Sequence, residues 1–191
     1  MVTIKLWLYF WIKQLDKTKN MNKSLGLILL ITLSMATHSY AQTNEIKWMT
    51  LPQVEVAMKK KPKKIFVDIY TEWCGWCKRL DAGTYKDPAV VKYINENFYS
   101  VKVDAEMKEA IIYLGKTYNY DASQKKNLIA AQFMGESGGY PTLTYIDENF
   151  KVLEVKPGYV DGAAFLKTLK YYGDNYYLNM DINKYNTEIT K

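Results

Sequence analysis

Cys74 and Cys77 are the only cysteines among the 191 residues, and two residues separate them. They follow the apolar run 65–70 and lead into a helical pattern at 77–82. We therefore expect Cys74 at a helix N-terminus, where unpaired N–H groups and the helix dipole favour a thiolate. Cys77 lies one helical turn later, close enough to form a disulfide with Cys74. This spacing predicts a redox pair, because a two-residue gap closes too small a loop for a purely structural disulfide to stabilise the fold much.

The two cysteines are expected to divide the work of thiol–disulfide exchange. Cys74 should be the exposed nucleophile, with a pKa lowered by the helix N-terminus. Cys77 should be the more buried member, which attacks the mixed disulfide at Cys74 and releases the substrate.

An aspartate, Asp68, interrupts the apolar run 65–70. That run has the composition of a strand buried on both faces, where a carboxylate is costly. Burial raises the pKa of a carboxyl group toward the range that is useful for proton transfer. We expect Asp68 to exchange a proton with Cys77 through a water; the alternative is a capping or loop residue.

The formal net charge of +6 does not indicate a nucleic-acid partner. Residues 1–41 hold five lysines and one aspartate, and the rest of the chain carries only +2. No basic stripe remains, so we expect no binding to nucleic acid. The single histidine, His38, also lies in this first segment. If the segment is removed, histidine-dependent catalysis and histidine metal sites are excluded.

Residues 21–41 have the anatomy of a signal peptide, with cleavage expected before Gln42. Residues 1–20 form an N-terminal extension, and a mis-assigned start codon with Met21 as the true initiator is the preferred explanation. An uncleaved membrane anchor, built with the apolar patch 6–12, is the alternative. Either way we expect a periplasmic or secreted protein, in a compartment where disulfides persist.

One domain, residues 42–173, should follow, because the chain is long and apolar enough for a single core. The segment 174–191 is polar and rich in tyrosine. We expect it to be either loosely ordered or a short extra helix packed on the domain. We see neither internal repeats nor a second domain.

The remaining patterns alternate between helix and strand. Strands are expected at 65–70, 99–104, 142–147 and 151–156. Helices are expected at 77–82, at 106–118, at 127–134 and after Thr50, Asp87 and Asp161, each of which should be the N-cap of the helix that follows it. This order predicts two parallel strands joined by a helix, then an antiparallel hairpin, with helices on both faces of the sheet.

The pattern resembles the thioredoxin superfamily over about residues 46–172. The segment 67–78, Val-Asp-Ile-Tyr-Thr-Glu-Trp-Cys-Gly-Trp-Cys-Lys, is similar to the family's active-site strand and loop. It carries Asp68 six residues before Cys74, where thioredoxins have a buried aspartate. The segments 139–142 and 158–159 resemble the family's cis-proline loop and the glycine before its last helix. Further residues look like an exported bacterial subgroup, which resembles the C-terminal domain of the transmembrane disulfide reductase.

The resemblance implies how a substrate would bind. It implies a cis bond between Tyr140 and Pro141, and a backbone at Tyr140 that pairs with an extended substrate. Trp73 and Trp76 are expected to flank the site as apolar platforms, although packing alone is an alternative for both. Gly75 and Trp76 stand where thioredoxin has Gly-Pro, a dipeptide that tunes the reduction potential.

Two other departures concern the surroundings of the site. Ser100 aligns with the thioredoxin lysine that lies near the buried aspartate, and Lys102 is two residues further on the same face. The stretch from Asp104 to Pro141 is longer than in thioredoxin. We expect an inserted helical segment at 106–126 there, as a partner surface or as simple decoration.

The resemblance implies a three-layer α/β/α thioredoxin-like fold with a central mixed sheet, and a thiol–disulfide oxidoreductase without a cofactor. We expect a monomer that reduces protein disulfides and takes electrons from a membrane-embedded thiol donor. Reduction is preferred because Asp68 and Gly75 are thioredoxin-like and the dipeptide contains no histidine. The alternatives are an oxidase or isomerase, a redox-inactive binding module, and a thiolate carrier of Cu(I) or Zn(II). No further cysteine or histidine would complete a zinc shell.

Overall fold

The computed structural model describes residues 45–136 and 138–188. The expected signal peptide and the extension before it, residues 1–41, lie outside the described residues. Within the described part, no helix is long and apolar enough to cross a membrane.

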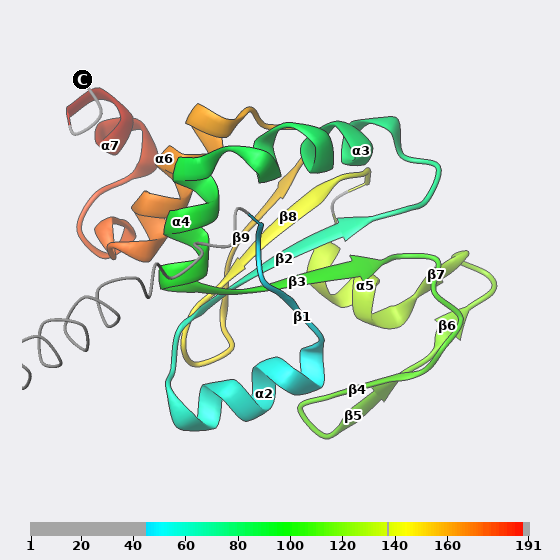
Figure 1. The fold of residues 1–191 in the computed structure, drawn as a ribbon. Coiled ribbons are helices and arrows are strands. Elements are labelled where there is room, and N and C mark those ends of the chain that lie inside the picture. Colours follow the sequence, from blue (N-terminus) through cyan, green and yellow to red (C-terminus); the bar gives the residue numbers. More distant parts are fainter. Residues whose placement is uncertain (1–44, 137, 189–191) are drawn as a thin grey trace, which may run out of the picture. The chain divides into compact units, whose positions relative to one another are not determined.

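A mixed sheet of five strands, in the order β1-β3-β2-β8-β9, forms the centre of the domain (Figure 1). Its strands are β1 (Trp48–Met49), β2 (Lys64–Tyr70), β3 (Phe98–Asp104), β8 (Thr142–Ile146) and β9 (Val152–Pro157). β1 and β2 run parallel to β3, whereas β8 pairs antiparallel with both β2 and β9. The predicted parallel pair and antiparallel hairpin are confirmed. β1 was not predicted, because two residues are too few to show an alternating pattern.

Helices cover both faces of this sheet (Figure 1). One face carries α3 (Gly75–Ala82), the 3₁₀ helix η1 (Thr84–Lys86), α4 (Pro88–Asn97) and α6 (Gly162–Gly173), and the other carries α2 (Leu51–Lys60) and α5 (Leu128–Met134). The predicted N-caps are confirmed, since the side chains of Thr50, Asp87 and Asp161 each accept a backbone N–H of the following helix. The three-layer α/β/α arrangement is therefore confirmed.

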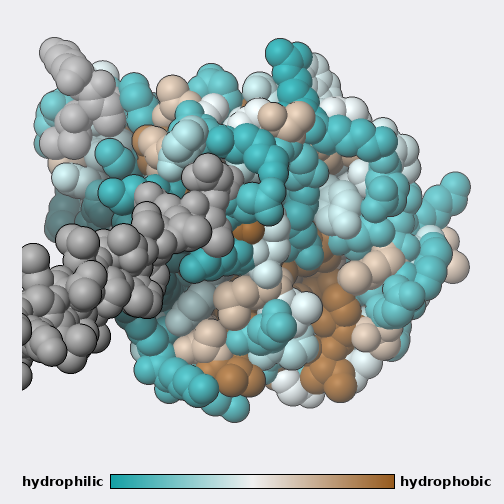
Figure 2. All heavy atoms as spheres, in the orientation of Figure 1, coloured by the Kyte–Doolittle hydropathy of each residue, from teal (hydrophilic) through white to brown (hydrophobic). Residues whose placement is uncertain are grey.

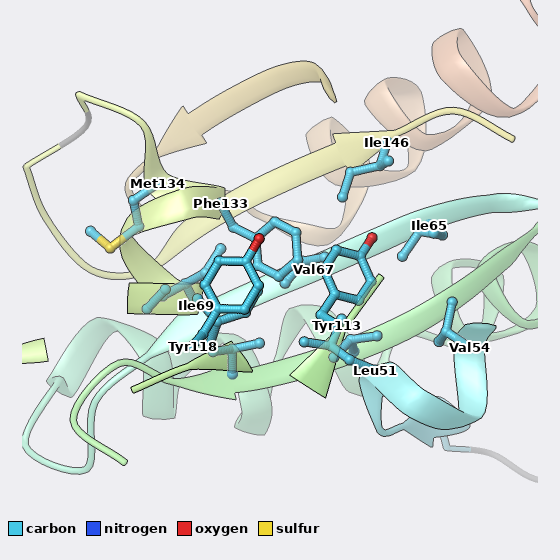
Figure 3. Close-up of a cluster of buried hydrophobic side chains, with 14 of the residues drawn as sticks. Leu51, Val54, Ile65, Val67, Ile69, Tyr113, Tyr118, Phe133, Met134 and Ile146 are labelled. Carbon is cyan, nitrogen blue, oxygen red and sulfur yellow. The ribbon is translucent and has the colours of Figure 1, made fainter. Parts of the chain in front are cut away.

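The side chains of β2 alternate between the two faces of the sheet, as the pleat of a strand requires. Ile65, Val67 and Ile69 pack in the cluster with α2 and α5 (Figure 3). Phe66 packs in the other cluster, with α3, α4 and α6. Asp68 belongs to the face of Phe66, so it lies under the helix that begins at the cysteine pair.

The insertion between β3 and α5 is not helical, so the helix expected at 106–118 is wrong. The chain forms two small hairpins: β4 (Ile111–Tyr113) with β5 (Lys116–Tyr118), and β6 (Tyr120–Asp121) with β7 (Lys126–Asn127). Leu114 and Gly115 have φ of 49° and 73°, which makes a two-residue turn with both central residues at positive φ. Tyr113 and Tyr118 then point into the core. The apolar run 110–114 fits either period, and the glycine turn decides for strands.

The hairpin of β4 and β5 also forms part of an apolar surface. A pocket of about 470 Å³ lies between it, α2 and β3, and its lining is mainly apolar. Ile112 and Leu114 are 61% and 50% exposed. Figure 2 shows apolar residues gathered on this face of the molecule. Neither Cys74 nor Cys77 lines the pocket.

Residues 174–188 pack on the domain as helices. Of the two alternatives for this segment, a loosely ordered tail is therefore wrong, and a helical segment packed on the domain is confirmed. It forms two short helices, η2 (Tyr176–Leu178) and α7 (Ile182–Glu188). Tyr185 is only 2% exposed, and its ring lies 5.2 Å from that of Tyr171. The buried ammonium of Lys64 in β2 donates to Asn175 Oδ1 at 2.7 Å and to Glu148 Oε1 at 2.9 Å. These contacts tie residues 174–188 to the central sheet.

Candidate functional site

The ends of four strands lie together at one edge of the sheet. β2 and β3 end there, because Tyr70 pairs with Asp104 in parallel register. β8 begins there, because Ile69 pairs with Thr142, and β9 ends there, because Thr142 pairs with Pro157. The cysteine pair follows β2 directly. The loop before β8 and the loop after β9 are thus brought beside it from more than sixty residues away.

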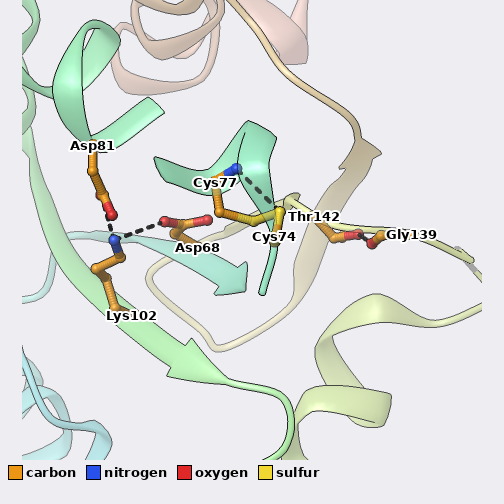
Figure 4. The surroundings of a disulfide bond; sticks show 7 residues. All are labelled: Asp68, Cys74, Cys77, Asp81, Lys102, Gly139 and Thr142. Carbon is orange, nitrogen blue, oxygen red and sulfur yellow. Dashed lines mark hydrogen bonds and ion pairs between the residues drawn. A yellow bond between two sulfur atoms is a disulfide. The ribbon is translucent and has the colours of Figure 1, made fainter. Parts of the chain in front are cut away.

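The two cysteines form a disulfide in this structure (Figure 4). Cys74 is the N-cap of α3, and its Sγ accepts the backbone N–H of Cys77 at 3.0 Å. The predicted position at a helix N-terminus is confirmed. In this oxidised form the bond fixes the Cys74 sulfur at the first turn of α3.

The expectation that Cys74 is exposed is wrong for this state. Cys74 is 4% exposed and Cys77 is 2% exposed. The reason is local, because the Cys74 sulfur is bonded to Cys77 and accepts the Cys77 N–H, and so lies against the first turn of α3.

Asp68 is completely buried, and both of its carboxylate oxygens lack a hydrogen-bond partner among the described residues. Figure 4 shows the carboxylate between Lys102 and the disulfide. Burial raises the pKa of Asp68 to about 7, although the Lys102 ammonium acts in the opposite direction. The expected burial and raised pKa are confirmed. A carboxyl group in this condition can take or give a proton near neutral pH.

Lys102 provides the cation beside Asp68. The two residues pair across β2 and β3, and Lys102 Nζ lies 3.6 Å from Asp68 Oδ2. Lys102 also donates to Asp81 Oδ1. Ser100, which aligns with the thioredoxin lysine, is buried and has no hydrogen-bond partner for its hydroxyl among the described residues.

Asp81 was missed from the sequence, although a signal exists. It lies four residues after Cys77, which places both on one face of α3, above Lys102. Asp81 competes with Asp68 for the single ammonium, and its charge raises the pKa of Asp68.

The loop before β8 contains a cis peptide bond between Tyr140 and Pro141, as the resemblance implied. Gly158 donates its backbone N–H to Pro141 O at 2.8 Å. Thr142 Oγ1 donates to Gly139 O at 2.7 Å (Figure 4). These bonds hold the loop at the edge of the sheet where the cysteines lie.

The two tryptophans that flank the cysteines are open to solvent. Trp73 is 66% exposed and Trp76 is 54% exposed, so packing alone does not account for them. The Trp73 ring meets Tyr140 edge-on with 5.7 Å between centroids, and the Trp76 ring lies 5.4 Å from Tyr159. Between them Gly75 opens α3, with no atom within 4 Å of where a Cβ would be.

The described residues contain no group of three or more histidine, cysteine, aspartate or glutamate side chains that could hold a metal ion. The arrangement of a cysteine pair, a buried carboxyl group and an exposed aromatic rim is suited to exchange of thiols and disulfides with a large partner.

Comparison with known proteins gives matches to thioredoxin-like proteins. A family model described as a thioredoxin-like domain matches residues 51–173. The thiol:disulfide interchange protein DsbD from Vibrio vulnificus (strain YJ016) is 26% identical over 138 residues. That match covers 68% of this chain and 20% of DsbD, so the chain spans about a fifth of the length of this relative.

Two of the similar solved structures illustrate the shared fold. A thioredoxin-fold protein from Helicobacter pylori has a TM-score of 0.54 at 17% identity, over 78% of this chain and 89% of the other. A DsbH oxidoreductase has a TM-score of 0.51 at 20% identity, over 68% of this chain and 85% of the other. These likenesses extend beyond the cysteine loop to the body of the domain.

Proposed function

The chain belongs to the thioredoxin-like family, and from this premise we propose that it reduces disulfide bonds of exported proteins by dithiol–disulfide exchange. One observation carries the proposal: the fully buried carboxyl group of Asp68, which has the Lys102 ammonium at 3.6 Å but no hydrogen-bond partner among the described residues, lies beside a cysteine pair at a helix N-terminus. Buried carboxyl groups that accept no hydrogen bond are rare and need a reason. Proton exchange with a buried thiol near neutral pH is such a reason.

The first step uses the reduced form of the cysteine pair. The Cys74 thiolate attacks one sulfur of a substrate disulfide, and a new bond forms between Cys74 and that sulfur. The substrate S–S bond breaks, and the other substrate sulfur leaves as a thiolate that takes up a proton. The helix N-terminus and the N–H of Cys77 support the attacking thiolate.

The second step releases the substrate. Asp68 accepts the proton of the Cys77 thiol, and the Cys77 thiolate attacks Cys74 Sγ. The Cys74–Cys77 disulfide forms and the second substrate sulfur leaves as a thiolate. Overall the substrate gains two electrons from the cysteine pair. The pair, a thiolate and a thiol at the start, gives up one proton, which Asp68 can pass to the leaving substrate thiolate, and the second proton comes from solvent. The product is the oxidised form that the structure describes.

A reductase must then be reduced again. A thiol donor of the membrane, as the homology to DsbD suggests, would return two electrons to the Cys74–Cys77 disulfide. We place the reaction in the periplasm, because residues 21–41 have the pattern of a signal peptide.

The substrate would lie across the exposed aromatic rim. Trp73, Gly75 and Trp76 would contact it around the attacked sulfur, and the backbone at Tyr140 and Pro141 would pair with its extended chain. The open space at Gly75 leaves room for a substrate backbone close to Cys74.

The reduction potential of the Cys74–Cys77 pair tests the direction of electron flow. We expect a value near ~−270 mV, at the thioredoxin end, after equilibration with dithiothreitol and glutathione buffers. A value near ~−120 mV would mean an oxidase and would overturn the proposal. If Cys74 and Cys77 do not form a reversible dithiol–disulfide couple, the chain would instead be a binding module.

Two variants test the roles of the sulfurs. Cys77→Ser should accumulate a mixed disulfide through Cys74, because the resolving thiol is missing. Cys74→Ser should form none. Non-reducing electrophoresis followed by mass spectrometry measures both. If Cys74→Ser still retains a partner as strongly as the native chain, binding rather than exchange is the activity.

A further inference from the structure

Two aromatic clusters at the rim carry opposite charges. We call Trp73, Tyr140 and Glu106 the acidic rim, and Trp76, Tyr159 and Arg79 the basic rim. Each combines an exposed tryptophan that flanks Cys74 with a tyrosine from another loop and one charged side chain.

In the acidic rim, Glu106 holds the indole of Trp73. Trp73 Nε1 donates to Glu106 Oε1 at 3.1 Å, and the Trp73 ring meets Tyr140 edge-on. Burial raises the pKa of the Tyr140 hydroxyl first, and the carboxylates of Glu106 and Asp104 raise it further. Glu106 thus places one carboxylate beside Trp73 on this side of Cys74.

In the basic rim, the guanidinium of Arg79 lies over two rings. Its Cζ is 5.4 Å from the ring centroid of Trp76 and 5.4 Å from that of Tyr159. Arg79 follows Trp76 by three residues on α3, so both lie on one side of the helix. It forms no ion pair within 45–136 and 138–188, so its charge is held in place but not neutralised there.

The sheet places Glu106, the charged member of the acidic rim, and Tyr159 of the basic rim on opposite sides of β2, the strand that leads to the cysteine pair. Glu106 follows the end of β3, on one side of β2, whereas Tyr159 follows the end of β9, beyond β8 on the other side. From β3 to β9 there are three strand spacings, or roughly 14 Å. An extended peptide covers that distance with about four residues.

We propose that the two rims recognise a polypeptide cysteine flanked by opposite charges: a basic side chain about two residues away over the acidic rim, and an acidic one about two residues away over the basic rim. The proposal rests on the proposed function, because the substrate sulfur must lie at Cys74. The acidic group would meet Arg79 on its aromatic support, and the basic group would meet Glu106.

Peptides that differ only in the order of their charges test this. The pair is Lys-Ala-Cys-Ala-Glu and Glu-Ala-Cys-Ala-Lys, with blocked ends and the cysteine in a disulfide with uncharged mercaptoethanol. Composition and net charge are the same, so only the fit to the rims differs. We expect the reduced protein to react about fivefold faster with one isomer, since exposed ion pairs contribute modestly. The ratio should shrink in high salt.

Variants then assign the preference to the rims. Arg79→Met keeps an apolar stem on the rings, and Glu106→Gln keeps an acceptor for Trp73. The double variant should bring the ratio of the two rates close to one. Lys167→Met, which removes one exposed positive charge from α6, should leave the ratio and the basal rate unchanged.

Equal rates for the two isomers with the native chain would overturn the proposal, as would a preference that survives in the double variant. Reduction of 2-hydroxyethyl disulfide by the native chain separates this failure from failure of the proposed function. If that uncharged disulfide is reduced and no charge preference exists, only the recognition is wrong.

Discussion

Replacement of Asp68 by asparagine should stabilise the oxidised protein, and more so as the pH rises. The native carboxyl group has a pKa of about 7, because it is fully buried. In the unfolded chain the same group has a pKa of about 3.9. Between these two values the native state holds a proton that the unfolded state has lost. Stability from this group is therefore complete below about pH 4 and falls as the pH rises to about 7.

The size of the effect follows from the two pKa values. Each pH unit in this window costs about 1.4 kcal/mol. Over about three units the loss approaches about 4 kcal/mol, as an order of magnitude. Asparagine has a similar volume and carries no charge, so Asp68→Asn avoids this loss. It leaves Lys102 with its contact to Asp81.

The assay is urea unfolding of the oxidised native chain and of Asp68→Asn at several pH values between 5 and 8. The difference in unfolding free energy should grow in favour of the variant by about 1.4 kcal/mol per pH unit up to about pH 7, then level off. Asp161→Asn is the matched control. It replaces an exposed aspartate whose capping role asparagine can also fill, so we expect no slope. Parallel stability curves for native chain and Asp68→Asn would refute the argument.

Two further predictions concern the surroundings of the site and the last helix. Lys102→Met removes the ammonium that lowers the pKa of Asp68. The pH at which Cys77 resolves a mixed disulfide at half its maximal rate should therefore move upward, as stopped-flow kinetics between pH 6 and 9 would measure. A midpoint that stays or falls would contradict the role of Asp68 as the proton acceptor of Cys77. Tyr185→Ala empties a position that is 2% exposed, so it should cost about 3 kcal/mol and lower the Tm by about 6–12 °C while the reduction potential is unchanged. A loss of under 2 °C in a thermal scan would show that α7 adds little to the fold.

Features that depend on a few neighbouring residues could be predicted from the sequence. The N-caps at Thr50, Asp87 and Asp161 involve contacts within three residues along the chain, and all three form. The position of Cys74 at the start of a helix is of the same kind. The burial of Asp68 followed from its place inside an apolar run.

The insertion shows where local patterns fail. The run 110–114 is apolar at spacings that fit a helix or a strand, and its interpretation as a helix was wrong. The two-residue turn at Leu114 and Gly115 and the burial of Tyr113 and Tyr118 against α5 favour two strands. That packing is tertiary, so the helical period alone could not exclude it.

The sequence by itself determined the chemistry that this chain can perform, because the two cysteines and the aspartate six residues before Cys74 lie close together along the chain. Only the tertiary structure decided which groups surround them. Lys102 meets Asp68 because of the register between β2 and β3, and Glu106 is separated from Tyr159 because of the strand order β3-β2-β8-β9. Register and strand order depend on contacts between distant segments. No pattern within one segment encodes these contacts, so the charge of the surroundings appears only once the sheet is assembled.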